Sequence, residues 1–299
     1  MNAPARQTAS FLRRRFEQAG VRPRARYGQS FLVDLNLLDI LVEAAQLEPH
    51  DVVLEVGTGT GSLTQWMAPR VAAVVTVEID RQLFQLASEE LYTLENVTML
   101  QLDALQNKNR LNPAVLDAVW EALDAAPGRR FKLVANLPYS AATPVIGNLL
   151  ALERAPHSMI VTVQKELAER LTARPGTKDY GALSIWVQSQ CEAEVVRILP
   201  PSAFWPRPKV ESAIVRIVLD PGRRAQIADR ALFHEFTRSL FRHRRKLLRG
   251  QLLSMMQGQF DKAQVDAVLG AVGLSAHARA EQLDVATMLR LCAACHGQP

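Results

Sequence analysis

The chain has 299 residues, and its 48% hydrophobic content is enough for one large core and a second, smaller one. A net charge of +5 and an isoelectric point near 9.3 favour a polyanionic partner, although many soluble proteins that bind no nucleic acid have similar values. Only three cysteines occur, and we find neither an apolar run of roughly 18 residues nor a hydrophobic signal core, so we expect a soluble, cytoplasmic monomer without disulfides or a membrane partner.

Residues 1–20 are predicted to be a helical appendage. The first sixteen residues are rich in arginine and contain no acid, a composition shared with mitochondrial presequences. We favour a short helix instead, because Ser10 can cap a helix through Phe11 and Phe16, and Gly20 is placed to end it.

Helices and strands alternate from Asp34 onwards. Apolar residues at helical spacing predict a helix over 34–46, and the apolar run Val52–Val56 predicts a strand covered on both faces. Further strands, separated by helical segments, are predicted at Ala73–Val77, Val97–Leu102, Phe131–Ala135 and Met159–Val163. This alternation is typical of an α/β fold with a parallel, doubly wound sheet.

The pattern changes after Tyr180. A helical stretch is followed by candidate strands at Glu194–Ile198 and Ala213–Leu219, which are predicted to close the sheet with an antiparallel edge. Beyond Asp220-Pro221-Gly222 only helices are predicted, at about 228–241, 244–256, 261–271 and 284–294. We therefore expect one domain over 21–220 and a small all-helical domain over 221–299.

A glycine-rich loop follows the first strand of the sheet, in the sequence Glu55-Val56-Gly57-Thr58-Gly59-Thr60-Gly61. Glycines such as Gly57 and Gly59 let the backbone turn sharply and lie against a ligand, and the helix that follows offers unpaired amides. The loop indicates a nucleotide-like ligand, but it does not distinguish a dinucleotide from a smaller one.

Two acidic residues end the next strands. Glu78 follows the second strand and Asp103 the third, so both are expected at the carboxyl edge of the sheet, where they can hold an adenosine. The alternative is that these acids are helix caps. Glu78 or Asp80 would then cap the helix after the second strand, and Asp103 the helix after the third. The same arrangement also serves NAD-dependent oxidoreductases, which remain a competing class.

The segment Asn136-Leu137-Pro138-Tyr139 directly follows the fourth strand and is expected at the same edge. An adenine amine is a poor nucleophile, so a methylase gains by accepting hydrogen bonds from it during attack. The Asn136 side chain and the carbonyl of Leu137, oriented by Pro138, are candidate acceptors, and Tyr139 offers a face for an extruded base. An ordinary strand-to-helix turn is the alternative. Attack on a sulfonium methyl needs no metal.

Further motifs, in order along nearly the whole chain, resemble the ribosomal RNA adenine dimethyltransferase family. Its bacterial members are small-subunit (16S) rRNA adenine N6,N6-dimethyltransferases. Besides the glycine loop and Asn136–Tyr139, the motifs are Tyr27-Gly28-Gln29-Ser30-Phe31-Leu32, Gln164-Lys165-Glu166, Tyr180-Gly181, Pro201–Phe204, Pro208–Ala213, Arg244-Arg245-Lys246 and Arg279-Ala280-Glu281.

The resemblance implies a class I S-adenosylmethionine-dependent methyltransferase with a Rossmann-like, seven-stranded sheet and a helical C-terminal domain. It implies that Tyr139 and Phe204 flank the adenine. Ser30 stands where the family often has asparagine, and Thr58 replaces a common proline. The implied S-adenosylmethionine contacts are Ser30, Leu32, Gly57, Glu78, Asp103 and Asn136.

Basic residues gather in two places. Arg24 lies with Arg22 and Arg26 ahead of the sheet, and the second cluster is expected on one helix of the C-terminal domain. We predict that they contact the phosphates of small-subunit rRNA, the alternative being a solvated helix face. The second cluster comprises Arg242, Arg244, Arg245, Lys246 and Arg249.

Cys292-Ala293-Ala294-Cys295-His296 spells a haem-attachment pattern. We expect neither haem nor zinc here, because no export signal or second ligand pair accompanies it.

The sequence is compatible with three functions. The leading one is an enzyme that methylates each of two adjacent adenines twice, with a role in small-subunit biogenesis. The others are an RNA-binding assembly factor whose catalysis is secondary or lost, which intact Asn136 and Tyr139 disfavour, and an NAD enzyme, for which no hydride-transfer residues are evident. Within the family, the rival is the antibiotic-resistance type that modifies large-subunit rRNA. Resemblance of the C-terminal domain and the Pro200–Phe204 loop favours the small-subunit type.

Overall fold

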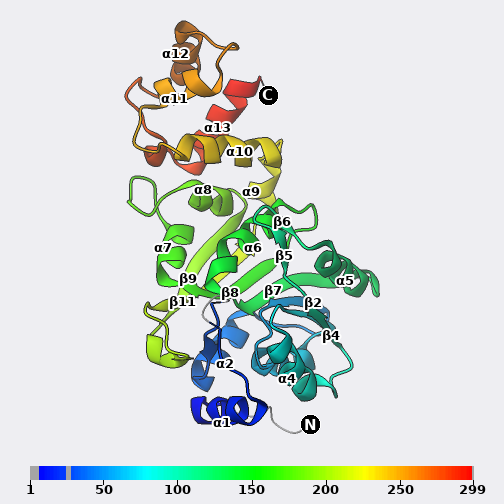
Figure 1. The fold of residues 1–299 in the computed structure, drawn as a ribbon. Coiled ribbons are helices and arrows are strands. Elements are labelled where there is room, and N and C mark those ends of the chain that lie inside the picture. Colours follow the sequence, from blue (N-terminus) through cyan, green and yellow to red (C-terminus); the bar gives the residue numbers. More distant parts are fainter. Residues whose placement is uncertain (1–6, 25–27, 298–299) are drawn as a thin grey trace. The chain divides into compact units, whose positions relative to one another are not determined.

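The computed structural model describes residues 7–24 and 28–297, which form two compact units (Figure 1). The first unit contains the described residues up to Ala168 together with Glu194–Val218. The second contains Glu169–Ala193 and the described residues from Leu219 onwards. Separate functions for residues 1–20, 21–220 and 221–299 stay a prediction.

A seven-stranded sheet runs in the order β4-β3-β2-β7-β8-β11-β9. The first five of these strands are parallel to one another, and β11 runs antiparallel to β8. Each predicted strand is present, so the prediction of a doubly wound sheet with an antiparallel strand toward one edge is confirmed. The strands are β2 (Asp51–Val56), β3 (Ala73–Glu78), β4 (Val97–Gln101), β7 (Arg130–Asn136), β8 (Ser158–Gln164), β9 (Cys191–Leu199) and β11 (Ser212–Leu219).

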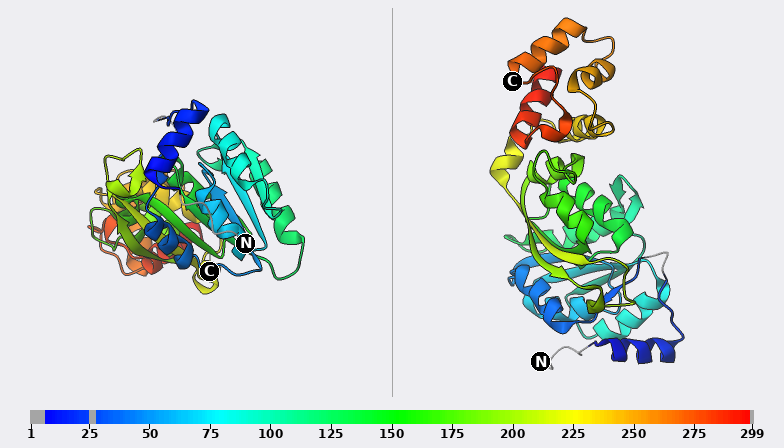
Figure 2. Two further views of the ribbon diagram at one scale, coloured as in Figure 1. Left: turned by 90° about the horizontal axis from the view of Figure 1, so that it is seen from below. Right: turned by 90° about the vertical axis from the view of Figure 1, so that its left-hand side faces the viewer.

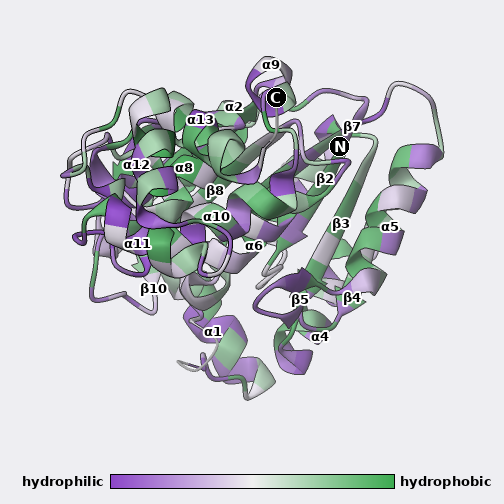
Figure 3. Cartoon of the chain, turned by 90° about the horizontal axis from the view of Figure 1, so that it is seen from above, coloured by the Kyte–Doolittle hydropathy of each residue, from purple (hydrophilic) through white to green (hydrophobic). Residues whose placement is uncertain are grey.

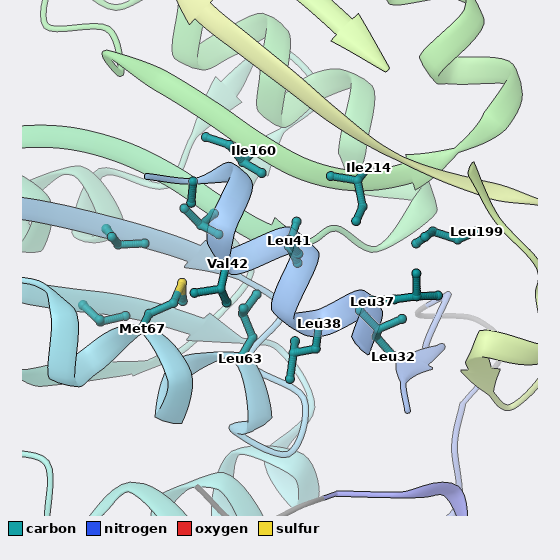
Figure 4. Packing of buried hydrophobic residues seen from close by; sticks show 14 of the residues in the cluster. Leu32, Leu37, Leu38, Leu41, Val42, Leu63, Met67, Ile160, Leu199 and Ile214 are labelled. Carbon is teal, nitrogen blue, oxygen red and sulfur yellow. The ribbon is translucent and has the colours of Figure 1, made fainter. Parts of the chain in front are cut away.

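Apolar side chains explain why the central strands are covered on both faces. In Figure 3, β3 is hydrophobic along most of its length, and every residue of β2 is buried. On one side the core includes α2 (Leu35–Ala44) and α3 (Ser62–Met67). There Leu41 and Met67 lie in one cluster with Ile160 of β8 (Figure 4). Asp34 caps α2 by accepting from the backbone amides of its first turn.

The helices α4, α5 and α6 of the first unit each lie between successive strands along the chain (Figure 2). The segment that begins in this unit as α7 continues past Ala168 into the second. Two short strand pairs, β1 with β10 and β5 with β6, were not predicted, because two- and three-residue strands have no readable periodicity. These elements are α4 (Arg81–Leu91), α5 (Pro113–Asp124), α6 (Tyr139–Ala151), α7 (Lys165–Thr172), β1 (Phe31–Leu32), β10 (Phe204–Trp205), β5 (Leu105–Asn107) and β6 (Arg110–Leu111).

The N-terminal helix α1 spans Ala9–Ala19. Gly20 ends it in the left-handed conformation, with φ at 64°, which confirms the predicted stop. The predicted cap was wrong: Thr8, not Ser10, has extended backbone, and its hydroxyl accepts from the amide of Phe11 at 3.3 Å. Ser10 already lies inside the helix.

Helices make up most of the second unit, and the four predicted in its C-terminal part are all present. The prediction that one of them starts at 244 was wrong. Residues 242–246 form a turn, closed by a hydrogen bond from the amide of Lys246 to the carbonyl of His243 at 2.7 Å. The helices are α8 (Ala182–Gln188), α9 (Pro221–Ala225), α10 (Arg230–Phe241), α11 (Leu248–Met255), α12 (Lys262–Ala271) and α13 (Val285–His296).

A buried ion pair joins the end of α2 to the start of β2 and to β7. The carboxylate of Asp51 accepts from Arg130 Nε at 2.9 Å and pairs with Lys132 Nζ at 2.8 Å. Lys132 also donates to two carbonyl oxygens that follow the end of α2. Burial by itself would raise the pKa of Asp51, but hydrogen bonds from Arg130 and Lys132 outweigh it, so this pKa lies below its ordinary value.

We predict that Asp51→Ala lowers the free energy of unfolding at neutral pH by about 3–5 kcal/mol, because Lys132 stays buried without its carboxylate. Urea unfolding measures the change. Asp124→Ala, which removes an exposed pair with Arg154, is the control and should change stability little.

The same pair makes stability depend on pH. Because the pKa of Asp51 is depressed in the folded state, its contribution is present above the unfolded-state pKa and lost as pH falls through the folded-state pKa. The difference between wild type and Asp51→Ala should therefore narrow toward roughly pH 3. An unchanged difference would contradict this account.

Candidate active site

A cavity of about 320 Å³ opens in the first unit at the carboxyl ends of the central strands. The strand order changes direction at β2, which lies between β3 and β7. Open α/β sheets bind ligands at such a switch point. The cavity brings together most of the predicted site residues: Ser30, Gly57, Gly59, Glu78, Asp103, Asn136, Leu137, Pro138 and Tyr139.

The glycine loop fits closely against its neighbours. Gly57 has φ at 90°, and a Cβ atom there would lie 3.2 Å from Cδ of Pro138. At Gly59, with φ at 59°, a Cβ atom would lie 3.2 Å from the ring of Phe31. Both positions combine the left-handed conformation with a close approach, so both require glycine. The loop and the Asn136–Tyr139 segment are thus in direct contact.

Glu78 lies at the end of β3 and is 5% exposed. Its two carboxylate oxygens accept from the amides of Gly59 and Asp80, each at 2.9 Å. Burial raises the pKa of Glu78 to about 7, although the two backbone hydrogen bonds oppose the shift. Asp80, not Glu78, caps α4 by accepting from the amide of Gln82, so the capping alternative holds only for Asp80.

Asp103 is exposed at the rim of the cavity, and its carboxylate accepts from the amide of Leu105 at 2.9 Å. It does not cap the following helix, since Asn112 caps α5. Its proposed contact with a ligand stays a prediction.

The side-chain amide of Asn136 has a fixed orientation. Its Nδ2 donates to the carbonyl oxygen of Ser30 at 2.8 Å. A carbonyl can only accept, so the nitrogen must face Ser30 and the oxygen must face the other way. Ser30 itself is held by a hydrogen bond from its hydroxyl to the carbonyl of Pro206 at 2.9 Å. The Asn136 oxygen is therefore presented as an acceptor.

Tyr139 is the first residue of α6 and is half-buried at the cavity. Its hydroxyl shares a hydrogen bond of 2.7 Å with that of Ser212, at the start of β11. Burial raises the pKa of Tyr139, and the bond to Ser212 opposes the shift only in part, so the phenol is neutral at physiological pH. The ring is thereby fixed at one end.

Two predicted residues do not line this cavity. Leu32 and Phe204 face each other in the β1–β10 pair, and both are buried in the core cluster where Leu32 is labelled in Figure 4. Phe204 is only 3% exposed. Their predicted contacts with cofactor and base stay predictions.

Some of the predicted RNA-binding residues form ion pairs within the protein, and others do not. Arg24, in the first unit, lies 3.6 Å from Asp80 and donates to Gln82; Arg26 and Tyr27 lie outside the described residues. In the second unit, Arg245 and Lys246 are exposed and have no ion-pair partner among the described residues. The other three cations there form ion pairs: Arg242 with Glu235, Arg244 with Glu281 and Arg249 with Asp266.

Sequence reasoning missed a buried polar network behind the loop. The carboxylate of Glu55 accepts from Thr64 and from Thr76, and the hydroxyls of Thr58 and Thr76 are 2.6 Å apart. Burial raises the pKa of Glu55 to about 8. The sequence does hold a signal for this network, because Glu55 is an acid inside an otherwise apolar strand. Ile79, 42% exposed at the cavity, gave no signal, because exposure of one isoleucine cannot be read from sequence.

Neither the Cys292–His296 segment nor any other part of the described chain groups three or more His, Cys, Asp or Glu side chains as a metal site. Among the described residues no helix is long and apolar enough to span a bilayer.

The fold is that of Rossmann-like methyltransferases. The dimethyladenosine transferase of Plasmodium falciparum superposes with a TM-score of 0.69 at 24% identity, covering 86% of this chain and 94% of that one. The 23S rRNA methyltransferase ErmE superposes with a TM-score of 0.61, also at 24% identity, covering 89% and 99%. These likenesses confirm the predicted fold class.

Sequence comparison identifies the family. The model for ribosomal RNA adenine dimethylase matches residues 20–293. A protein of Caldanaerobacter subterraneus subsp. tengcongensis called ribosomal RNA small subunit methyltransferase A is 38% identical over 265 residues, covering 89% of this chain and 94% of that protein. One of the same name from Geobacillus thermodenitrificans is 39% identical over 266 residues, covering 88% of each. The chain belongs to the ribosomal RNA adenine dimethylase family, which rules out the NAD enzyme.

We predict that Gly57→Ala destabilises the protein by about 1–3 kcal/mol, because the added Cβ combines backbone strain with a clash against Pro138. Gly147→Ala in α6 is the matched control: a Cβ there meets nothing within 4 Å, and alanine should be neutral or stabilising by about 0.5–1 kcal/mol. Thermal unfolding compares the two. Equal effects would contradict the close approach.

Proposed function

We propose that this chain transfers methyl groups from S-adenosylmethionine to the N6 amines of two adjacent adenines in small-subunit rRNA, giving N6,N6-dimethyladenine, and that it acts in small-subunit biogenesis. The observation that carries the proposal is the orientation of Asn136. Its amide oxygen is held as an acceptor on the sheet edge that also bears Glu78 and the glycine loop.

The cavity suits S-adenosylmethionine. Gly57 and Gly59 leave the backbone open to close approach, and Glu78 offers carboxylate oxygens to the two hydroxyls of a ribose. Ile79 and Leu102 add apolar surface for an adenine ring, and Asp103 lies at the rim. When bound, S-adenosylmethionine supplies an electrophilic methyl group.

Asn136 and Leu137 account for activation of the target amine. Their oxygens accept hydrogen bonds from the N6 hydrogens, which leaves the nitrogen lone pair less delocalised into the ring as the new N–C bond forms. The amine then releases one proton. Because the monomethylated amine still has one hydrogen, one acceptor suffices for a second round.

Tyr139 provides the surface on which an extruded adenine stacks. A stacked base gains roughly 1–3 kcal/mol on an aromatic ring. The hydrogen bond to Ser212 holds the ring in place before the base arrives, so less freedom is lost on binding. We propose in addition that the exposed Arg245 and Lys246 contact RNA phosphates.

The small subunit is favoured over the large one by sequence similarity. Relatives named for the small subunit are 38–39% identical over most of the chain, whereas likeness to the large-subunit enzyme, at 24% identity, supports the fold alone.

The test is to incubate the protein with methyl-labelled S-adenosylmethionine and unmodified small or large ribosomal subunits, and to map modified nucleotides by mass. We predict two adjacent dimethyladenines in the small subunit only. Asn136→Ala should lower kcat by about 10²–10³-fold, since one transition-state acceptor is lost.

Tyr139→Phe and Tyr139→Ala form a matched pair in the same assay. Phenylalanine keeps the stacking face and should retain most activity, while alanine should lose it. Label in neither subunit, or full activity in Asn136→Ala, would overturn the proposed function.

Glu78 should make cofactor binding depend on pH. With its pKa near 7, the carboxylate form that accepts from ribose hydroxyls becomes predominant between roughly pH 6 and pH 8, so affinity for S-adenosylhomocysteine should rise by up to about tenfold over that range. Isothermal titration calorimetry measures it. Glu78→Gln should bind more weakly and lose this dependence; a dependence that persists in the variant would assign it to another group.

A further inference from the structure

Gln7, just ahead of α1, is buried against the glycine loop. Its Nε2 donates to the carbonyl oxygen of Thr60 at 3.1 Å, and its Oε1 accepts from the hydroxyl of the same residue. Gln7 is 1% exposed and Thr60 is 3% exposed. One side chain therefore satisfies both a backbone and a side-chain group at the tip of the loop, 53 residues away along the chain.

Thr60 is the place where such an anchor has most effect. It lies between Gly59 and Gly61, whose φ angles are 59° and 78°. Glycines in this conformation leave a loop with much freedom to lose on ordering. The amide of Gly59 is also the donor that Glu78 accepts. Holding Thr60 thus holds the Gly59 amide and, through it, the carboxylate proposed to bind ribose.

Aromatic packing is a second link between α1 and the glycine loop. Phe16 packs edge-on against Phe31, with ring centroids 5.4 Å apart, and against Trp205 at 5.2 Å. Phe31 lines the cavity, and its ring is the group that approaches Gly59. Phe16 is 2% exposed, so its buried ring supports the ring of Phe31.

Ion pairs fix α1 to the unit that carries the loop. Arg15 lies 2.7 Å from Glu90 and 3.3 Å from Glu89, both at the end of α4. Its guanidinium also reaches the carbonyl of Leu86 at 3.4 Å. Three kinds of contact, polar, aromatic and ionic, therefore hold Gln7 and α1 against the first unit.

We infer that Gln7 and α1 position the glycine loop for the cofactor, with Gln7 as a positioning residue that raises affinity for S-adenosylmethionine. The inference rests on the proposed function. It concerns a segment outside the match to the family model, which begins at residue 20. Gln7 acts on the loop before ligand arrives, so its loss raises the KM for S-adenosylmethionine and leaves kcat and the KM for RNA unchanged.

The test is calorimetric binding of S-adenosylhomocysteine to the full chain. Gln7→Ala and the more nearly isosteric Gln7→Met should both raise Kd by about 3- to 10-fold, because both lose the two hydrogen bonds to Thr60. The binding stoichiometry should stay near one, which separates weakened binding from partial unfolding. Gln18→Ala, a glutamine on the exposed face of α1, is the matched control and should bind like wild type.

Hydrogen exchange of the α1 amides supplies a second readout through thermodynamic linkage. If α1 favours cofactor binding, bound S-adenosylhomocysteine must stabilise α1, so hydrogen exchange of its amides should slow in the complex, and less so in Gln7→Met. Unchanged Kd and exchange in the variants, with wild type binding normally, would overturn the inference and leave the proposed function intact. No binding by wild type would overturn both.

Discussion

The close approach of Pro138 to Gly57, which leaves no room for a Cβ atom, is the constraint on which the candidate site depends. It requires a residue without a side chain in the loop after β2 and a ring of fixed shape after β7. Since β2 and β7 are parallel neighbours, their carboxyl ends meet, and the contact sets how closely the two loops approach. A ligand bound at the glycine loop would therefore lie beside Asn136, whose amide has only one orientation against Ser30.

Much of this arrangement could be predicted from sequence. The central strands of the large sheet are short, mostly apolar runs, and a parallel order places residues such as Glu78 and Asn136 at one edge without further information. The glycine loop was readable because Gly57 and Gly59 mark special backbone. The residues of the loop do not identify its ligand, and the prediction of S-adenosylmethionine came from the family resemblance alone.

Other features depended on tertiary contacts that no local pattern records. Thr8 rather than Ser10 caps α1, because the helix begins two residues earlier than the spacing suggests. The basic cluster was predicted on one helix, but residues 242–246 form a turn and Arg249 lies in α11. Three of its cations form ion pairs, with Glu235, Glu281 and Asp266. The burial of Phe204 follows from a two-residue strand pair with Leu32, and Gln7 meets Thr60 across 53 residues.

The central claim is that the cofactor and the target amine meet at the Gly57–Pro138 contact. A crystal structure with S-adenosylhomocysteine bound tests it most directly. We predict ribose hydroxyls within hydrogen-bonding distance of Glu78 and the sulfur atom beside the side-chain oxygen of Asn136, with Asn136 still bonded to Ser30. A ligand bound elsewhere, or a sulfur atom facing away from Asn136, would contradict the account.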